Sequence, residues 1–76
     1  MPRITLRTFA QLREQRGVAK EEVVLPEGTT ALEAYASLFA EPRVPVGFAV
    51  NHELVRGEVI LVEGDELALI PPVGGG

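Results

Sequence analysis

Residues 66–76 read ELALIPPVGGG, and this stretch decides how the rest of the sequence is interpreted. Leu67 and Leu69 alternate with outward-facing neighbours, which predicts a strand with one face in the core. The pair Pro71–Pro72 ends the strand, because proline has no backbone N–H to give to a sheet. The glycines beyond it carry no Cβ, so residues 71–76 are expected to form a thin, flexible and extended C-terminal tail. Such a tail suits a narrow channel in another protein, although chain ends also fray without any function.

The sequence before this stretch predicts four further strands and two helices. Alternating apolar residues mark the strands, and apolar residues three and four apart mark the helices. Gly17 supplies a left-handed end to the first helix, and Thr30 with Glu33 forms a capping box at the start of the second. The expected elements are a strand over 3–9, a short helix over 10–16, a strand over 21–25, a helix from Thr30 that ends before Pro42, a hairpin over 48–55 turning at Asn51-His52, and the final strand over 66–70.

The second helix is expected to carry the core. Its apolar residues recur at i, i+3, i+4 and i+7 and would form one stripe against the sheet. These residues are Leu32, Tyr35, Ala36 and Phe39. The main order of strand, strand, helix and three strands predicts an α+β fold of the β-grasp type, a mixed sheet of about five strands with one main helix on one face. A right-handed crossover makes the first and last strands parallel neighbours. We expect one such domain over residues 1–76.

Composition and charge exclude several classes of function. The chain has 76 residues, no cysteine and a hydrophobic fraction of 46%, which allows a small core but no disulfide or thiolate metal site. Its net charge of −4 argues against a nucleic-acid binder, which needs a basic face for phosphates. The longest unbroken apolar run, residues 59–62, is far too short to cross a membrane, and no signal peptide is evident. We expect a cytoplasmic protein without nucleic-acid or membrane partners.

The alternation of the strands also places apolar side chains on the sheet face opposite the helix. A face that no helix covers is ordinarily polar. An exposed apolar cluster beside the tail indicates a docking surface, whereas apolar residues scattered singly over a surface indicate nothing. The residues expected on this outward face are Phe9, Ala49, Leu54, Ala68 and Ile70.

No self-contained active site is evident in the sequence. His52 is the only histidine and falls in an expected turn, so neither a metal site nor a nucleophile–base pair is expected. The reactive group that remains is the C-terminal carboxylate of Gly76. Condensation with ATP would convert it to an acyl-adenylate, and a sulfur donor would then displace AMP and leave a thiocarboxylate. A tail without side chains suits the enzyme that must close around this carbonyl.

The most distinctive segments are residues 9–14, FAQLRE, and residues 70–76, IPPVGGG. The first is similar to the F-A-x-L-R-E segment, and the second to the terminal P-P-V-x-G-G, of the MoaD-type sulfur carriers, the small-subunit family of molybdopterin synthase. Residues 49–55 and 63–66 also resemble the hairpin and the last turn of this family, although other β-grasp carriers share them. The resemblance extends over the whole chain and implies a ubiquitin-like β-grasp fold.

The same resemblance implies a sulfur carrier that has no catalytic activity alone. An adenylyltransferase resembling ubiquitin-activating enzymes would use ATP to activate Gly76, which then carries the sulfur as a thiocarboxylate; the carrier itself would bind no cofactor. The tail, with Gly74 and Gly75, would thread into the large synthase subunit of a heterotetramer, where the sulfur forms the dithiolene of molybdopterin. The expected partner-binding residues are Phe9, Arg13, Leu54, Ile70 and Val73.

Other functions stay open at this point. Gly74 makes a triple glycine, which is also seen in the thiamine-pathway carriers of this fold, so the sulfur acceptor could belong to thiamine synthesis or to tRNA thiolation. A protein modifier that joins Gly76 to lysines is a further possibility, although Lys20, the only lysine, gives little support to lysine-linked chains. The last alternative is a β-grasp binding module whose tail has no function. Removal of Gly76 would leave the function of such a module intact and would abolish the function of every other candidate.

Overall fold

Five strands of the chain form one mixed sheet in the order β2-β1-β5-β3-β4. The computed structural model describes residues 1–72, and the expected strands and both expected helices form within that range. β2 is displaced by one residue from its expected bounds, β1 ends one residue early, and β3 begins one residue early. The elements are β1 (Arg3–Thr8), α1 (Ala10–Arg16), β2 (Lys20–Val24), α2 (Ala31–Leu38), β3 (Gly47–Val50), β4 (Glu53–Val55) and β5 (Glu66–Ile70).

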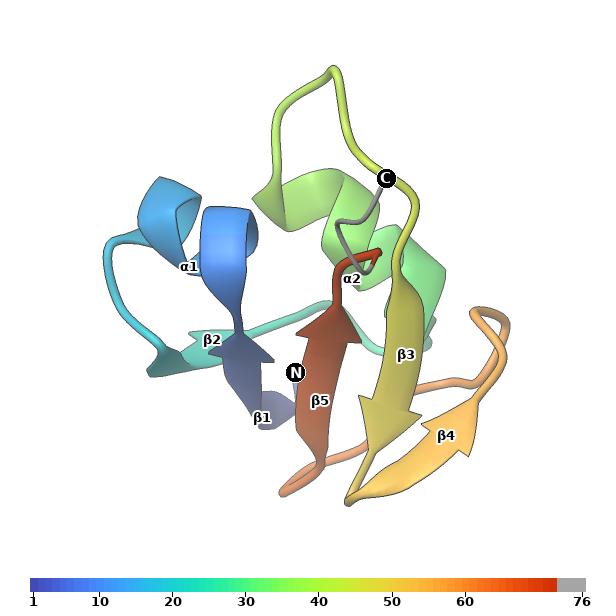
Figure 1. The fold of residues 1–76 in the computed structure, drawn as a ribbon. Helices are drawn as coiled ribbons and strands as arrows, with labels where there is room; N and C mark the ends of the chain where they lie inside the picture. The colour runs from blue at the N-terminus through green and yellow to red at the C-terminus, as the bar shows by residue number, and fades with distance from the viewer. Residues whose placement is uncertain (73–76) are drawn as a thin grey trace.

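The first and last strands lie side by side at the middle of the sheet and run parallel, as expected (Figure 1). Their register places Leu6 opposite Leu67, while β2 and β3 flank this central pair in antiparallel orientation. Each strand of the pair keeps the alternation read from the sequence, with Leu6, Leu67 and Leu69 fully buried. This is the mixed sheet of a β-grasp fold, and the prediction of fold class is confirmed.

Helix α2 packs across one face of the sheet and lies behind it in Figure 1. Tyr35 contacts Phe39 and Phe48 through tilted and edge-to-face rings whose centroids are 5.3 and 6.5 Å apart. These rings lie in the same buried cluster as the inward leucines of β1 and β5. Over the opposite face, which we call the front face, lies no helix of the described part of the chain (Figure 1).

The apolar stripe expected on α2 is wrong in two of its four residues. Leu32 is 55% exposed and Ala36 is also exposed, whereas Ala31 and Ala34 are fully buried beside Tyr35. The N–H of Ala31 donates to the carbonyl of Val59, which fixes the first turn with this small residue against the core. The helix therefore approaches the sheet through alanines, and the buried stripe is rotated by about one residue from the expected one.

The hairpin between β3 and β4 has the expected turn and register. Asn51 and His52 both adopt positive φ, 53° and 72°, which is the two-residue turn that matches the twist of the flanking strands. Phe48 lies opposite Val55 and Ala49 opposite Leu54, as expected. Among the helices of residues 1–72, none has the length and apolarity needed to span a bilayer.

Candidate functional site

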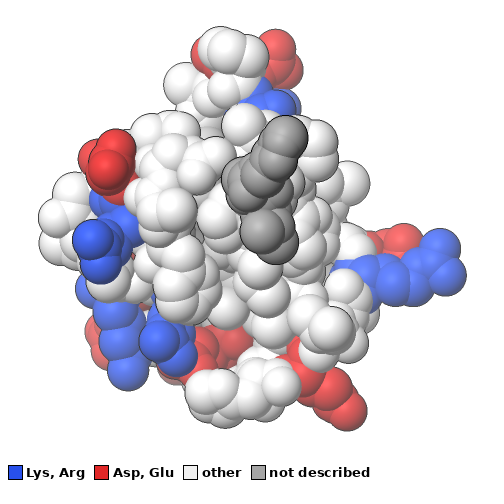
Figure 2. All heavy atoms as spheres, viewed as in Figure 1, with Lys and Arg blue, Asp and Glu red and all other residues white. Residues whose placement is uncertain are grey.

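The front face carries the apolar residues that the alternation of the strands predicts. Ala68 and Ile70 project from β5, and Ala49 of β3 lies directly opposite both Ala68 and Leu54 of β4. Phe9, which follows β1, completes the group. Figure 2 shows uncharged atoms across the middle of this face, with acidic and basic side chains gathered at its edges. An apolar surface rimmed by charge is typical of a site for another macromolecule.

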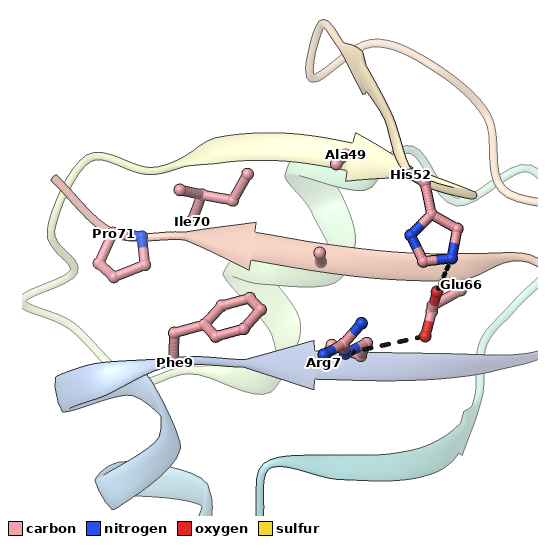
Figure 3. A pocket seen from close by; sticks show the side chains of 8 residues that line it. Arg7, Phe9, Ala49, His52, Glu66, Ile70 and Pro71 are labelled. Carbon is pink, nitrogen blue, oxygen red and sulfur yellow. Dashed lines mark ion pairs between the residues drawn. The ribbon is translucent and has the colours of Figure 1, made fainter.

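The middle of this surface is hollowed, with a volume of about 390 Å³. Ala49 (Figure 3) and Ala68 lie opposite each other in the sheet that forms its floor, and their small side chains leave space that a larger residue would fill. Phe9 and Ile70 border the space and are each more than one-third exposed, at 39% and 38%. Leu54 of β4 lies opposite Ala49 of the neighbouring strand β3, on the same face, and is 77% exposed. The hollow therefore has an alanine floor and bulky apolar borders.

The position of Phe9 results from the chain reversal between β1 and α1. Phe9 is the N-cap residue of α1, with extended backbone, and its carbonyl accepts from the N–H groups of Leu12 and Arg13. Ala10 then takes a φ of 51°, which is uncommon for a residue with a Cβ. This sharp turn starts the helix immediately after β1 and leaves the Phe9 ring on the front face.

One end of the hollow is polar, which the sequence analysis missed. Glu66 Oε1 lies 3.2 Å from His52 Nε2, and Glu66 Oε2 lies 3.8 Å from Arg7 Nε (Figure 3). All three residues line the hollow. The sequence did contain an indication of Arg7 and Glu66. The alternation with a period of two that places Phe9 and Ala68 outward also places these two residues outward.

The turn of the hairpin is joined to the start of β5 by side-chain hydrogen bonds. Asn51 Nδ2 donates to Asp65 Oδ1, and the Glu66 N–H donates to Asn51 Oδ1, both at 2.9 Å. Asp65 Oδ2 also accepts from the Val62 N–H at 2.8 Å. These bonds fix β5 relative to the hairpin, and with it the carboxylate of Glu66 at the end of the hollow.

The expected site residues are not all brought together. Phe9 and Ile70 border the hollow, and Pro71 lies at the end from which the chain leaves β5. Arg13 is exposed on α1 but does not line the hollow. Val73, Gly74, Gly75 and Gly76 lie outside the described residues, so their expected roles stay predictions. Within residues 1–72 there is no group of three or more His, Asp or Glu side chains placed to hold a metal ion.

Comparison with known proteins gives consistent matches over nearly the whole chain. The family model described as "ThiS family" matches residues 6–76. The human molybdopterin synthase sulfur carrier subunit is 36% identical over 77 aligned positions, covering 90% of this chain and 88% of that protein. The protein of the same name from Arabidopsis thaliana is 35% identical, covering 90% and 77%. The structure of a putative molybdopterin converting factor subunit 1 from Pyrococcus furiosus matches with a TM-score of 0.81 at 28% identity, covering 96% of this chain and all of that one.

Proposed function

The chain belongs to the ThiS family, and on that premise we propose that it is the sulfur-carrier subunit of a molybdopterin synthase. The human and Arabidopsis relatives carry that name, and each aligns with nine-tenths of this chain. The observation that carries the proposal is the apolar hollow on the sheet face that no helix of residues 1–72 covers, at the place where the chain leaves β5 for its glycine tail. A carrier needs such a surface beside its reactive end, because docking must deliver that end to a partner.

The proposed chemistry takes place on the carboxylate of Gly76. A carboxylate is a poor acyl donor, since its oxygen is a poor leaving group. Attack of the carboxylate on ATP forms the acyl-adenylate and releases pyrophosphate, and hydrosulfide then displaces AMP to leave a thiocarboxylate. The sulfur is a better nucleophile than the oxygen it replaces and can be transferred to a bound pterin precursor. The activating enzyme supplies the ATP site, and the carrier supplies the accessible carbonyl.

Two partners are proposed for the front face. One is an adenylyltransferase of the ubiquitin-activating type, and the other is the large synthase subunit, which accepts the loaded tail. Phe9, Leu54 and Ile70 supply the exposed apolar side chains that either partner would cover. Burial of such side chains at the centre of an interface commonly provides most of the binding energy.

The proposal is tested by the intact mass of the chain after incubation with ATP, the cognate activating enzyme and sulfide. We expect the replacement of one oxygen by sulfur, with no replacement in a variant that lacks Gly76. An unchanged mass, when the same enzyme loads a control carrier, would contradict the proposal.

The acceptor of the sulfur is tested separately, because the triple glycine at Gly74–Gly76 is compatible with thiamine synthesis or tRNA thiolation. We expect the chain to restore molybdenum-cofactor synthesis in cells that lack their own carrier, and not to restore thiamine synthesis. The reverse result would move the proposal to the thiamine branch. Covalent adducts between Gly76 and lysines of other proteins would instead support a protein modifier.

A further inference from the structure

Arg7 is held in a defined position at the edge of the hollow. Its guanidinium carbon lies 5.5 Å from the centroid of the Phe9 ring, and its Nε lies 3.8 Å from Glu66 Oε2. The side chain is 38% exposed. Arginine loses less freedom on binding when its planar group already rests on an aromatic ring, so Arg7 is prepared for a further contact.

The outer part of this guanidinium is available. Within residues 1–72, no acceptor forms a hydrogen bond with Nη1 or Nη2 of Arg7. By contrast, the guanidinium groups of Arg16 and Arg43 donate to carbonyl and carboxylate oxygens at 2.8–3.4 Å. Two parallel N–H groups of arginine match the two oxygens of a carboxylate, so the available edge of Arg7 has the geometry for one.

The charges around Arg7 favour an acidic contact. Lys20 of β2 lies directly opposite Arg7 in the β1–β2 register, on the same front face. Like charges opposite each other in a sheet are destabilising, and Glu66 is shared between Arg7 and His52. Glu22 lies on the same face of β2, opposite Thr5, so the basic pair of Arg7 and Lys20 is confined to the end of β1 that leads to Phe9. An approaching carboxylate would relieve the repulsion between Arg7 and Lys20.

We propose that the large synthase subunit, when it covers the front face, places a side-chain carboxylate against Arg7 and inserts an apolar side chain into the hollow. This inference rests on the proposed function, since it concerns the same docking event, and it adds which chemistry the partner presents. Apolar contact over Ala49 and Ala68 would provide affinity, and the Arg7–carboxylate pair would fix the orientation of the partner. Arg7 is thus a specificity-determining residue of the interface.

The test compares Arg7→Gln with Arg56→Gln in binding to the large synthase subunit. Arg56 is a matched control because its side chain is 87% exposed and pairs with Glu58, outside the hollow. We expect Arg7→Gln to raise Kd by about tenfold or more, and Arg56→Gln to change it by less than about twofold. We also expect a shallower dependence of log Kd on log salt in Arg7→Gln, because an ion pair across the interface is lost.

The variant Glu66→Gln distinguishes binding of the partner by Arg7 from a purely structural role in which Arg7 only holds Glu66. It removes the carboxylate that contacts Arg7 within the chain and leaves the guanidinium free. The proposal expects this variant to bind more tightly, whereas a structural role expects weaker binding in both variants. The loss of binding in Arg7→Glu should be rescued when one acidic residue of the large subunit is changed to Arg. Equal Kd values for the wild-type chain and Arg7→Gln, or an unchanged salt dependence, would overturn the assignment.

Failure of this inference differs from failure of the proposed function. If the wild-type chain gains sulfur and binds the large subunit, and Arg7→Gln binds equally well, only the assignment of Arg7 is wrong. If the wild-type chain neither gains sulfur nor binds the large subunit, the proposed function is wrong, and the assignment of Arg7 to this interface is wrong with it.

Discussion

Arg16, at the end of α1, connects three separate parts of the chain through one side chain. Its Nε and Nη2 donate to both carboxylate oxygens of Glu21 in β2 at 2.8 Å, and its Nη1 donates to the carbonyl of Leu38 at the end of α2 at 3.0 Å. Its guanidinium carbon also lies 5.7 Å from the centroid of the Phe39 ring. This arrangement joins both helices to an edge strand and has no role in the hollow.

We predict that Arg16→Gln lowers the free energy of unfolding by about 1–2 kcal/mol, because a bidentate ion pair with Glu21 and a hydrogen bond to a backbone carbonyl are lost from a partly exposed site. Denaturant unfolding at neutral pH measures this change. Arg56→Gln is the control, since Arg56 and Glu58 form an ion pair that is 87% and 71% exposed, and it should change stability by less than about 0.5 kcal/mol. Equal effects of the two variants would contradict the prediction.

The same pair predicts a dependence on pH. The hydrogen bond from Arg16 lowers the pKa of Glu21 below its ordinary value of 4.5, and partial burial opposes this shift. A lowered pKa in the folded state stabilises the protein above pH 4.5, and this contribution is lost as the pH falls through the folded-state pKa. The difference in unfolding free energy between the wild type and Glu21→Gln should therefore stay constant from pH 7 to 4.5 and shrink at lower pH. A difference that stays constant below pH 4.5 as well would contradict the assignment.

Among the apolar residues of the front face, Leu54 is the best position at which to change docking without changing folding, because it is 77% exposed. Leu54→Asp is predicted to keep the melting temperature and to weaken binding to the large subunit by about 2 kcal/mol or more, if the partner buries this side chain. Calorimetric titration measures the affinity. Val24→Asp is the control, since Val24 is 52% exposed on β2, at the edge of the sheet away from β5. Equal losses from both variants would indicate a general effect of charge.

At the scale of elements, the turn between β3 and β4 depends on Asn51 for both its backbone and its hydrogen bonds. Asn51→Gly keeps the positive φ and loses the side-chain bonds to Asp65 and Glu66, which we expect to cost about 1–3 kcal/mol. Asn51→Ala should cost about 1–2 kcal/mol more, because a Cβ disfavours this backbone conformation. Thermal unfolding of both variants measures which one is more stable. An Asn51→Ala variant that is more stable than Asn51→Gly would contradict the prediction.

Elements whose limits are set by local chemistry were predictable from the sequence. The Thr30–Glu33 capping box forms in both directions, with bonds of 3.1 and 3.0 Å, and Gly17 ends α1 with a φ of 82°. The buried face of α2 was not predictable from its own residues, because Leu32 and Ala31 begin two neighbouring apolar stripes that both include Tyr35. The bond from Ala31 N to Val59 O comes from a segment distant in sequence, and it decides between them.

The candidate site shows the same division between local and distant information. Period-two alternation was sufficient to place Phe9, Leu54 and Ile70 on the front face, because each strand fixes its own two faces. The polar end of the hollow was not predicted, since the contacts of Glu66 with Arg7 and His52 join three different segments of the chain. Two outward-facing charged residues on different strands predict a contact only after the register between those strands is known.

At the scale of the whole molecule, the two faces of the sheet have different roles. Helix α2 covers one face and packs on the core, and no helix of residues 1–72 lies over the other face (Figure 1). Pro71 lies at the border of that hollow, so the docking surface and the start of the tail are adjacent. A partner bound over the front face therefore determines where the tail can reach.

This adjacency predicts that docking and sulfur transfer can be separated by tail length. Gly76 is four residues beyond Pro72, and covalent geometry limits its distance from Pro72 to about 14 Å. Insertion of two glycines after Val73 should leave the affinity for the large subunit within about threefold, because the expected docking residues up to and including Val73 keep their places in the chain. Sulfur transfer should fall by more than about tenfold, since the carbonyl is no longer held at the reacting position. Single-turnover transfer from the loaded carrier measures the rate, and two alanines inserted between Gly17 and Val18 provide a control of equal length in an exposed turn. An unchanged rate with the lengthened tail would show that the front face does not set the position of the reacting end.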